Sequence, residues 1–362
     1  MTFYVISEPG FSTGIWHYNI MDGLIELQRK KRLYFEFLTD TAALNRAAIT
    51  ESDTAFVIGT DNEWLGAVLP RLGRLFGNKV IVLGNHNPIL CGIKYSTVMT
   101  DVRESVTALY SYLKSHKKDN IALYGINPCS ASDKLRRECF IDCGGKTANL
   151  FYMRNSFAEC FETFLRKSER YDAIICVNDY AAISLIRHLG ESNAKNKFFI
   201  AACGSSRLSQ HFSPSLTHTE SDYKEFAAAA YDIHRILHKN ADSSSVDIRL
   251  SCVLNIGETT CFLPPQAEIY DCSSADKQQD LYYSDAEVRE MMNTEKLLAL
   301  CDDADRRIIE LILGGKSAAR IAEILYLSQS AVKYKIKKMY KICDVESKDD
   351  FVSILNKYIK KP

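Results

Sequence analysis

The feature that most constrains this chain is a regular alternation over its first 260 or so residues. Short β-rich runs are followed by longer stretches that carry apolar residues at helical spacing. Such alternation is typical of βαβ units, in which consecutive strands lie parallel in one sheet. Several of the runs are apolar throughout, which indicates strands covered by helices on both faces. The sequence therefore predicts an α/β fold for this part of the chain.

The expected elements can be placed by residue number. Strands are expected at 3–6, 33–37, 54–58, 79–83, 121–124, 171–177 and 198–202. Helices are expected at 16–30, 64–76, 102–115, 132–139, 157–167 and 179–189. From about residue 266 the chain becomes polar and loses its periodicity, and we interpret this stretch as a linker that leads into a helix near 285–300. Beyond it every pattern is helical.

Charge is unevenly distributed, although the formal net charge of the 362 residues is zero. Residues 296–362 contain 14 Lys and Arg against 9 Asp and Glu, and residues 1–295 contain 31 against 36. A basic segment attached to an acidic body favours contact with nucleic acid. The alternative is an ordinary solvated face.

Several classes of protein are disfavoured. The sequence has no run of 18 apolar residues, so we expect no membrane contact. Its first residues lack a basic region and a long apolar core, so we expect a cytoplasmic location with the 12 cysteines reduced. The motifs of nucleophilic and nucleotide-dependent enzymes are missing, so we expect neither an enzyme nor a cofactor. His234 and His238 have a metal-compatible spacing, but without further ligands we expect a helix surface.

The last 60 residues predict four short helices. The first, at 303–313, is expected to end at Gly314 and Gly315, because a left-handed backbone favours glycine. Ser317 is expected to cap a second helix at 318–325, and Ser328 a third that ends near residue 342. Residues 326 and 327 form the tight turn between them. This is the spacing of a helix-turn-helix.

The third of these helices presents two different faces. At 100° per residue, one face carries apolar residues that we expect in a core: Val332, Ile336, Met339 and Cys343. The opposite face carries Ser330, Lys333, Tyr334, Lys337, Lys338 and Lys341. Lysines facing the phosphates of double-stranded DNA would displace counterions and make binding dependent on salt. The alternative is the solvated face of a small helical bundle.

The residues of this region also follow a known order. The runs are GKS at 315–317 and IAEILYLS at 321–328, followed by Val332, Lys333, Met339 and Val345. This order resembles the LuxR-type (GerE-like) helix-turn-helix domain and covers about residues 300–360. The resemblance implies that Lys333 contacts DNA, and we expect the caps Ser317 and Ser328 at the same interface. Tyr334 and Lys335 depart from the family's pattern, so its base preferences do not carry over.

Four runs in the α/β part form a second ordered set. They are S…RRECF at 132–140, YDAIICVNDYAA at 171–182, PSLTHTESD at 214–222 and LNIGETT at 254–260. The set resembles the lactose-repressor (LacI/GalR) family over about residues 1–262. The resemblance implies a two-lobed, periplasmic-binding-protein-like (type I) sensor domain with three crossovers, followed here by a small all-α helix-turn-helix domain. A ligand would sit between the lobes, at the carboxyl ends of parallel strands.

The expected ligand-binding residues come from this resemblance and from positions just after the first strand: Ser7, Phe11, Trp16, Arg136, Asn178 and Ser205. Arg136 aligns with the family's ligand-binding arginine, and a guanidinium suits paired hydroxyls or a carboxylate. Asn178 follows a strand, where its amide can both donate and accept. Ser205 replaces the family's sugar-gripping carboxylate. The alternatives are core packing for Phe11 and Trp16, and a salt bridge or cap for Arg136 and Asn178.

These expectations combine into one organisation. We expect a ligand-sensing domain at 1–265, a linker and connecting helix at 266–299, and the DNA-binding domain at 300–362. LacI-type repressors carry their DNA-binding helices before the sensor, so the linker here must transmit any signal. The sequence predicts a cytoplasmic, homodimeric transcription regulator that responds to a small effector, a sugar or related polar metabolite. The alternatives are a regulator whose sensor serves only for docking or dimerisation, and a cytoplasmic solute-binding protein or enzyme.

Overall fold

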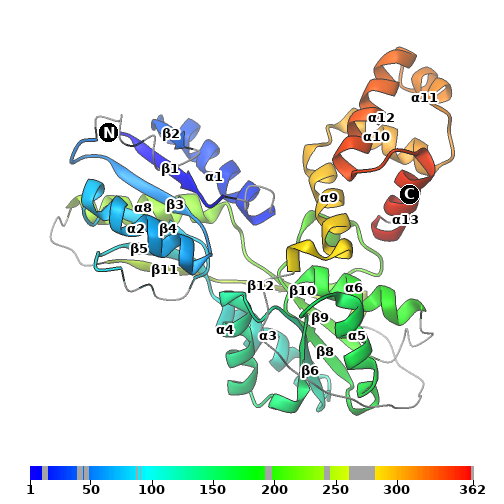
Figure 1. The fold of residues 1–362 in the computed structure, drawn as a ribbon, viewed down its shortest axis with the longest axis horizontal. Helices are drawn as coiled ribbons and strands as arrows, with labels where there is room; N and C mark the ends of the chain where they lie inside the picture. Colours follow the sequence, from blue (N-terminus) through cyan, green and yellow to red (C-terminus); the bar gives the residue numbers. More distant parts are fainter. Residues whose placement is uncertain are drawn as a thin grey trace. The chain divides into compact units, whose positions relative to one another are not determined.

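The computed structural model describes residues 1–9, 15–38, 44, 49–86, 89, 91–191, 198–239, 245–260 and 282–359. The chain divides into two compact units. The first comprises Met1–Val106, Ser130–Cys139 and Glu220–Val253, and the second comprises Thr107–Cys129, Phe140–Thr219 and Leu254–Pro362. Each unit contains one six-stranded sheet (Figure 1). The chain passes from one sheet to the other after β5, β10 and β11, which confirms the three expected crossovers.

Both sheets are built mainly from parallel strands. Across the first sheet the order is β11 (Asp247–Leu250), β5 (Ser96–Thr100), β4 (Val80–Leu83), β3 (Thr54–Ile58), β1 (Phe3–Ser7) and β2 (Phe35–Leu38), with all pairings parallel. Across the second sheet the order is β12 (Val253–Asn255), β10 (Thr217–Glu220), β9 (Phe199–Cys203), β8 (Ala173–Cys176), β6 (Ile121–Ile126) and β7 (Leu150–Tyr152). From β10 to β7 these pairings are also parallel.

Helices cover both faces of the first sheet. Alternate residues of each strand point to opposite faces. Phe56 and Ile58 pack with α1 (Ile15–Lys31) and α8 (Glu225–Lys239). Ala55 and Val57 pack on the other face against α2 (Asn62–Phe76). Coverage on both sides explains why every residue of β3 is buried.

The remaining helices of the α/β part are α3 (Val102–Ser115), α4 (Ala131–Asp142), α5 (Phe157–Leu165), α6 (Asp179–Glu191) and α7 (Arg207–His211). Short 3-10 helices lie at Thr147–Asn149, Ser168–Arg170, Glu258–Thr260 and Tyr282–Ser284. In the second unit, Phe164 of α5 contacts the rings of Tyr124, Phe151 and Tyr171. These aromatic contacts fix α5 against the sheet.

Five helices follow at the C-terminal end: α9 (Ala286–Leu300), α10 (Asp303–Leu313), α11 (Ala318–Ile324), α12 (Gln329–Cys343) and α13 (Lys348–Tyr358). The expected caps are present, because Ser317 Oγ accepts from the Arg320 N–H and Ser328 Oγ accepts from the Ala331 N–H. Their core contains residues of α10, α12 and α13 and also Leu297 of α9. The four expected C-terminal helices are therefore confirmed, with a contribution from the connecting helix.

The expected elements agree with the structure within a few residues, but five strands had not been expected. These are β5, β7, β10, β11 and β12. The last three carry polar residues or only partly buried ones, and β7 and β12 have three residues each. Such strands lack a strong hydrophobic pattern, and only their pairing with a neighbour identifies them. Within the described residues, no helix has both the length and the hydropathy needed to cross a membrane.

Candidate functional sites

The first candidate site is the exposed side of α12. Six residues, which we name the lysine face, are all exposed: Ser330, Lys333, Tyr334, Lys337, Lys338 and Lys341. On the opposite side, Val332, Met339 and Cys343 are buried in the core of the C-terminal helices. The predicted division of this helix into two faces is confirmed. Ser317 and Ser328, which begin α11 and α12, are exposed as well.

Lys335 has a different role from its neighbours on α12. Its ammonium group lies 2.9 Å from Asp302 Oδ2 and 2.8 Å from Asp305 Oδ1, and its side chain is 27% exposed. These two carboxylates, which cap the start of α10, raise the pKa of Lys335. Lys335 therefore holds α12 to α10 and does not belong to the lysine face.

Tyr326 was expected in the turn but was not selected for a functional role. It lies between α11 and α12 with a positive φ of 54°, and 97% of its surface is exposed. An exposed aromatic ring in the turn that leads into α12 is available for contact with a partner. The sequence identifies the turn, but the exposure of this ring follows only from the packing of the two helices.

Three of the expected ligand residues lie in the first unit. Ser7 ends β1, and its Oγ lies 3.0 Å from His17 Nε2. Trp16 packs against the core formed with α1 and α8. Arg136 lies on α4 and forms a salt bridge with the buried Asp133 at 2.7 Å. Trp16 thus makes the core contacts, and Arg136 makes the salt bridge, that were the alternatives to ligand binding. Phe11 lies outside the described residues.

Two further expected residues lie in the second unit, just beyond the carboxyl ends of β8 and β9. Asn178 Oδ1 accepts from the Ala181 N–H at 2.8 Å, and Asn178 Nδ2 donates to the Tyr282 hydroxyl at 2.9 Å. Ser205 Oγ lies 3.3 Å from Ser209 Oγ. Because β8 and β9 are paired and parallel, the structure brings Asn178 and Ser205 to the same edge of the sheet.

The same edge contains two buried carboxylates that sequence reasoning missed. Asp179 Oδ2 accepts from the Ser206 N–H at 2.9 Å. Glu295 of α9 accepts from the Arg207 N–H at 3.1 Å and from the Leu208 N–H at 2.5 Å. Burial raises the pKa of Asp179 and raises that of Glu295 to about 7. Asp179 directly follows Asn178 and had a local signal, whereas nothing near Glu295 in the sequence indicates this position.

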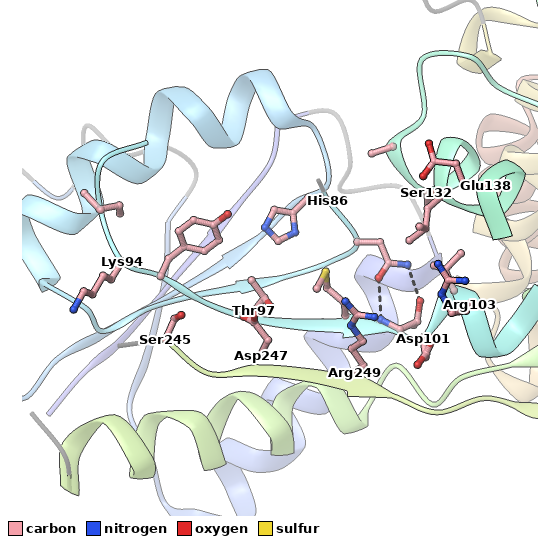
Figure 2. A pocket seen from close by; sticks show the side chains of 18 residues that line it. His86, Lys94, Thr97, Asp101, Arg103, Ser132, Glu138, Ser245, Asp247 and Arg249 are labelled. Carbon is pink, nitrogen blue, oxygen red and sulfur yellow. Dashed lines mark hydrogen bonds between the residues drawn. The ribbon is translucent and has the colours of Figure 1, made fainter. Parts of the chain in front are cut away.

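The first unit also contains a pocket of about 660 Å³ (Figure 2). Its walls come from the β4–β5 connection, β5, the start of α3, α4 and β11. The polar and charged residues among its lining are Asn85, His86, Lys94, Tyr95, Thr97, Thr100, Asp101, Arg103, Ser132, Glu138, Ser245, Asp247 and Arg249. The volume is within the range of about 300 to 1,000 Å³ that holds small molecules.

Hydrogen bonds hold several of the polar side chains inside this pocket. Asn85 is held by two bonds to Thr100, and Thr97 donates to Asp247 Oδ1 at 2.8 Å. His86 Nδ1 lies 3.2 Å from the Gly84 carbonyl oxygen, so a neutral ring donates there and leaves Nε2 as the acceptor. Burial lowers the pKa of His86, which favours that neutral form. His86 Nε2 is buried and has no hydrogen-bond partner within the described residues.

Comparison with known proteins gives a structural likeness only. Neither a protein-family model nor a curated protein matches the sequence. A LacI family transcriptional regulator from Enterococcus faecium with bound ribose is 16% identical, with a TM-score of 0.55 over 73% of this chain and 100% of its own. One from Weissella paramesenteroides with bound sucrose is 17% identical, with a TM-score of 0.55 over 72% and 98%. The Lac repressor bound to ONPG is 12% identical, with a TM-score of 0.57 over 72% and 82%.

At these identities the likeness establishes the fold and leaves the function open. The three structures are described as LacI-family regulators or as the Lac repressor, and each matches 72 or 73% of this chain. The C-terminal helices, from about residue 286 to 358, follow the α/β part. The chain therefore has a type I periplasmic-binding-protein-like fold followed by a helical region.

Proposed function

We propose that this protein is a ligand-responsive DNA-binding transcription regulator. Its C-terminal helices form a LuxR-type helix-turn-helix domain that binds double-stranded DNA, and its α/β part, about residues 1–265, binds a small polar effector. In this proposal the protein acts in the cytoplasm as a homodimer, whose two-fold symmetry would match paired half-sites about one helical turn apart. Effector binding changes the population of DNA-competent conformations.

The observation that carries this proposal is the division of α12 into a buried face and the lysine face. Four lysines and a tyrosine are exposed on one side of the helix, while its other side is part of a core. A helix of this kind can enter the major groove without losing its packing. Its lysines would release counterions from the phosphates, so that binding weakens as salt rises.

The test begins with a selection of duplexes that the purified full chain binds. Affinity for a selected duplex is then measured over a range of salt concentrations for Lys337→Ala and Lys341→Ala. Each variant should weaken binding to all sequences and should lower the salt slope by about 1, because one phosphate contact is lost. The control is Lys30→Ala, which removes an exposed lysine from α1. Equal affinities for all four proteins would show that α12 is not the recognition helix.

For the effector we propose a neutral, hydroxyl-rich molecule such as a sugar. The pocket in the first unit is lined by three cations and three carboxylates, so it suits hydroxyl groups better than a strongly charged ion. A thermal-shift screen of sugars, sugar acids, polyols, nucleosides and amino acids should find a compound that raises the melting temperature. Loss of the shift in Arg249→Ala would place the compound in the pocket, and loss in Arg136→Ala would place it at the predicted arginine. Arg235→Ala, an exposed residue of α8, is the control.

A second candidate function is a regulator whose sensor fold serves only for docking or dimerisation. The observation that favours it is that the Asn178 amide is already hydrogen-bonded to Tyr282. Under this alternative, no compound shifts the melting temperature although the protein still binds DNA.

A further inference from the structure

Residues 282–300, which we name the connecting segment, are held tightly on the second unit. Tyr282 is 5% exposed, its ring lies edge-on to Phe157, and its hydroxyl accepts from Asn178 Nδ2 at 2.9 Å. Glu287 accepts from Ser184 Oγ at 2.9 Å and from Arg187 Nη1 at 2.5 Å. The connecting segment has a third polar attachment at Glu295, whose carboxylate accepts from the two N–H groups at the start of α7. Three positions of the connecting segment thus bind the α/β part of this unit.

The connecting segment also holds the C-terminal helices. Leu297 is buried in their core, and Glu290 forms an ion pair with Lys357 of α13 at 2.8 Å. Arg187, which pairs with Glu287, also donates to the Tyr358 hydroxyl at 3.3 Å, and its guanidinium lies 5.2 Å from the centre of that ring. The same helix therefore links the C-terminal helices to the carboxyl ends of β8 and β9.

Asn178 is where these attachments meet the expected ligand site. Its Oδ1 is committed to the Ala181 N–H at the start of α6. Its Nδ2 carries two N–H groups, and one of them donates to the phenol oxygen of Tyr282. A phenol hydroxyl is chemically similar to the hydroxyl of a sugar or polyol. Tyr282 thus occupies one of the two positions in which such a ligand could accept a hydrogen bond from Asn178 Nδ2.

We propose that the connecting segment is an internal competitor of the effector, so that an effector hydroxyl at Asn178 displaces Tyr282 and loosens α9 together with the C-terminal helices. This inference rests on the proposed function, and it takes the effector to bind at the expected ligand residue Asn178, at the end of β8, and not in the pocket of the first unit. Competition lowers the apparent affinity by the fraction of molecules in which the site is open. Linkage requires the reverse effect as well, so that effector binding weakens the docking of the segment.

The test uses the full chain and the thermal-shift library of sugars, polyols and nucleosides. The library is applied to the wild type, Tyr282→Phe, Asn178→Ala and the control Tyr34→Phe, which alters an exposed tyrosine of the first unit. For the compound with the largest shift, Tyr282→Phe should lower the Kd about 2- to 10-fold, the equivalent of one neutral hydrogen bond. Asn178→Ala should abolish binding, and Tyr34→Phe should leave the Kd unchanged.

A second variant and a second readout separate competition from general loosening. Glu287→Gln removes the charge that pairs with Arg187 without touching Asn178, and it should also lower the Kd. Hydrogen exchange of residues 286–300 should speed up when the compound saturates the wild type, while exchange of β1 and β3 should not.

The inference is overturned if Tyr282→Phe binds no more tightly than Tyr34→Phe, if the compound leaves exchange of α9 unchanged, or if neither the wild type nor Tyr282→Phe binds any compound. Affinity for the selected duplex, measured on the same proteins, separates the two proposals. Competition without DNA binding would uphold this inference about the segment and refute the proposed regulator. DNA binding without competition would do the reverse.

Discussion

At the scale of single residues, α12 shows that one residue type can serve two purposes on one helix. Lys337 is exposed on the lysine face, whereas Lys335, two positions earlier, is held by the carboxylates of Asp302 and Asp305. Two positions correspond to a rotation of about 200° around the helix axis, so the two side chains leave on different sides. Which lysine faces a neighbouring helix depends on packing.

Lys335→Ala should destabilise the C-terminal helices by about 1 kcal/mol, because it removes a half-buried cation that pairs with two carboxylates. Lys337→Ala should leave their stability unchanged within about 0.5 kcal/mol, as is usual for an exposed position. Hydrogen exchange of the α12 amides measures both effects. An equal loss of protection in the two variants would contradict the distinction between them.

Glu295 should make stability depend on pH. Its pKa in the folded chain is about 7, raised by burial from its usual 4.5, so between these values the folded state holds a proton that the unfolded state has released. Stability from this group is therefore present below pH 4.5 and is lost as the pH rises towards 7, by up to about 3 kcal/mol.

The buried Asp179, whose pKa is also raised, acts in the same direction. Buried histidines with lowered pKa values act in the opposite direction. One of them is His234, whose pKa is about 4; it was expected on a helix surface, but it is buried where α8 packs against the sheet. The informative quantity is therefore the difference in stability between the wild type and a variant of Glu295. Urea unfolding of the wild type and of Glu295→Gln should show that the wild type loses stability relative to the variant as the pH rises from 5 to 8. A constant difference would show that Glu295 does not titrate in this range.

At the scale of elements, the end of α10 depends on one glycine of a pair. Gly315 has a φ of +76°, whereas Gly314 has a φ of −75°. Both had been expected to provide the left-handed stop, and only the second does so. The Lys316 N–H then bonds back to the Leu311 carbonyl oxygen at 3.0 Å, which closes the helix end before α11 begins.

Gly315→Ala should destabilise the C-terminal helices by about 1 kcal/mol, because an L-residue is strained in the left-handed region. No atom lies within 4 Å of the added Cβ, so the whole cost is conformational. Gly314→Ala is the matched control and should change stability by less than about 0.5 kcal/mol, since its Cβ would make contacts of 3.4 Å or more. Hydrogen exchange of the α10 and α11 amides distinguishes the two variants. Equal effects would refute the conclusion that Gly315 alone of the pair needs the left-handed backbone.

At the scale of the whole molecule, the helical core crosses the boundary that the sequence suggested. The DNA-binding domain was placed at 300–362, but Leu297 of the connecting helix is 1% exposed and lies in the core of the C-terminal helices. The other side of α9 binds α7 through Glu295. The domain division stays a prediction, and we propose that α9 belongs to both neighbours.

Leu297→Ala in the full chain should destabilise the C-terminal helices by about 2 to 4 kcal/mol, because it leaves a cavity in their core. Leu300→Ala, at a position that is 45% exposed on the same helix, should have a much smaller effect. Faster exchange of the α12 amides in the first variant only would show that the core extends into α9. Similar exchange in both would return α9 to the role of a simple linker.

The sequence by itself determined the alternation of strands and helices, the helix caps at Ser317 and Ser328, and the two faces of α12. These depend on periodicity and on side chains a few residues apart, so local order is sufficient. Only the tertiary structure decided that Tyr282 meets Asn178 and that Glu295 meets α7, because these partners are about 90 to 100 residues apart. A buried contact between distant residues leaves no periodic signal in either segment, since its energy arises only after both have packed.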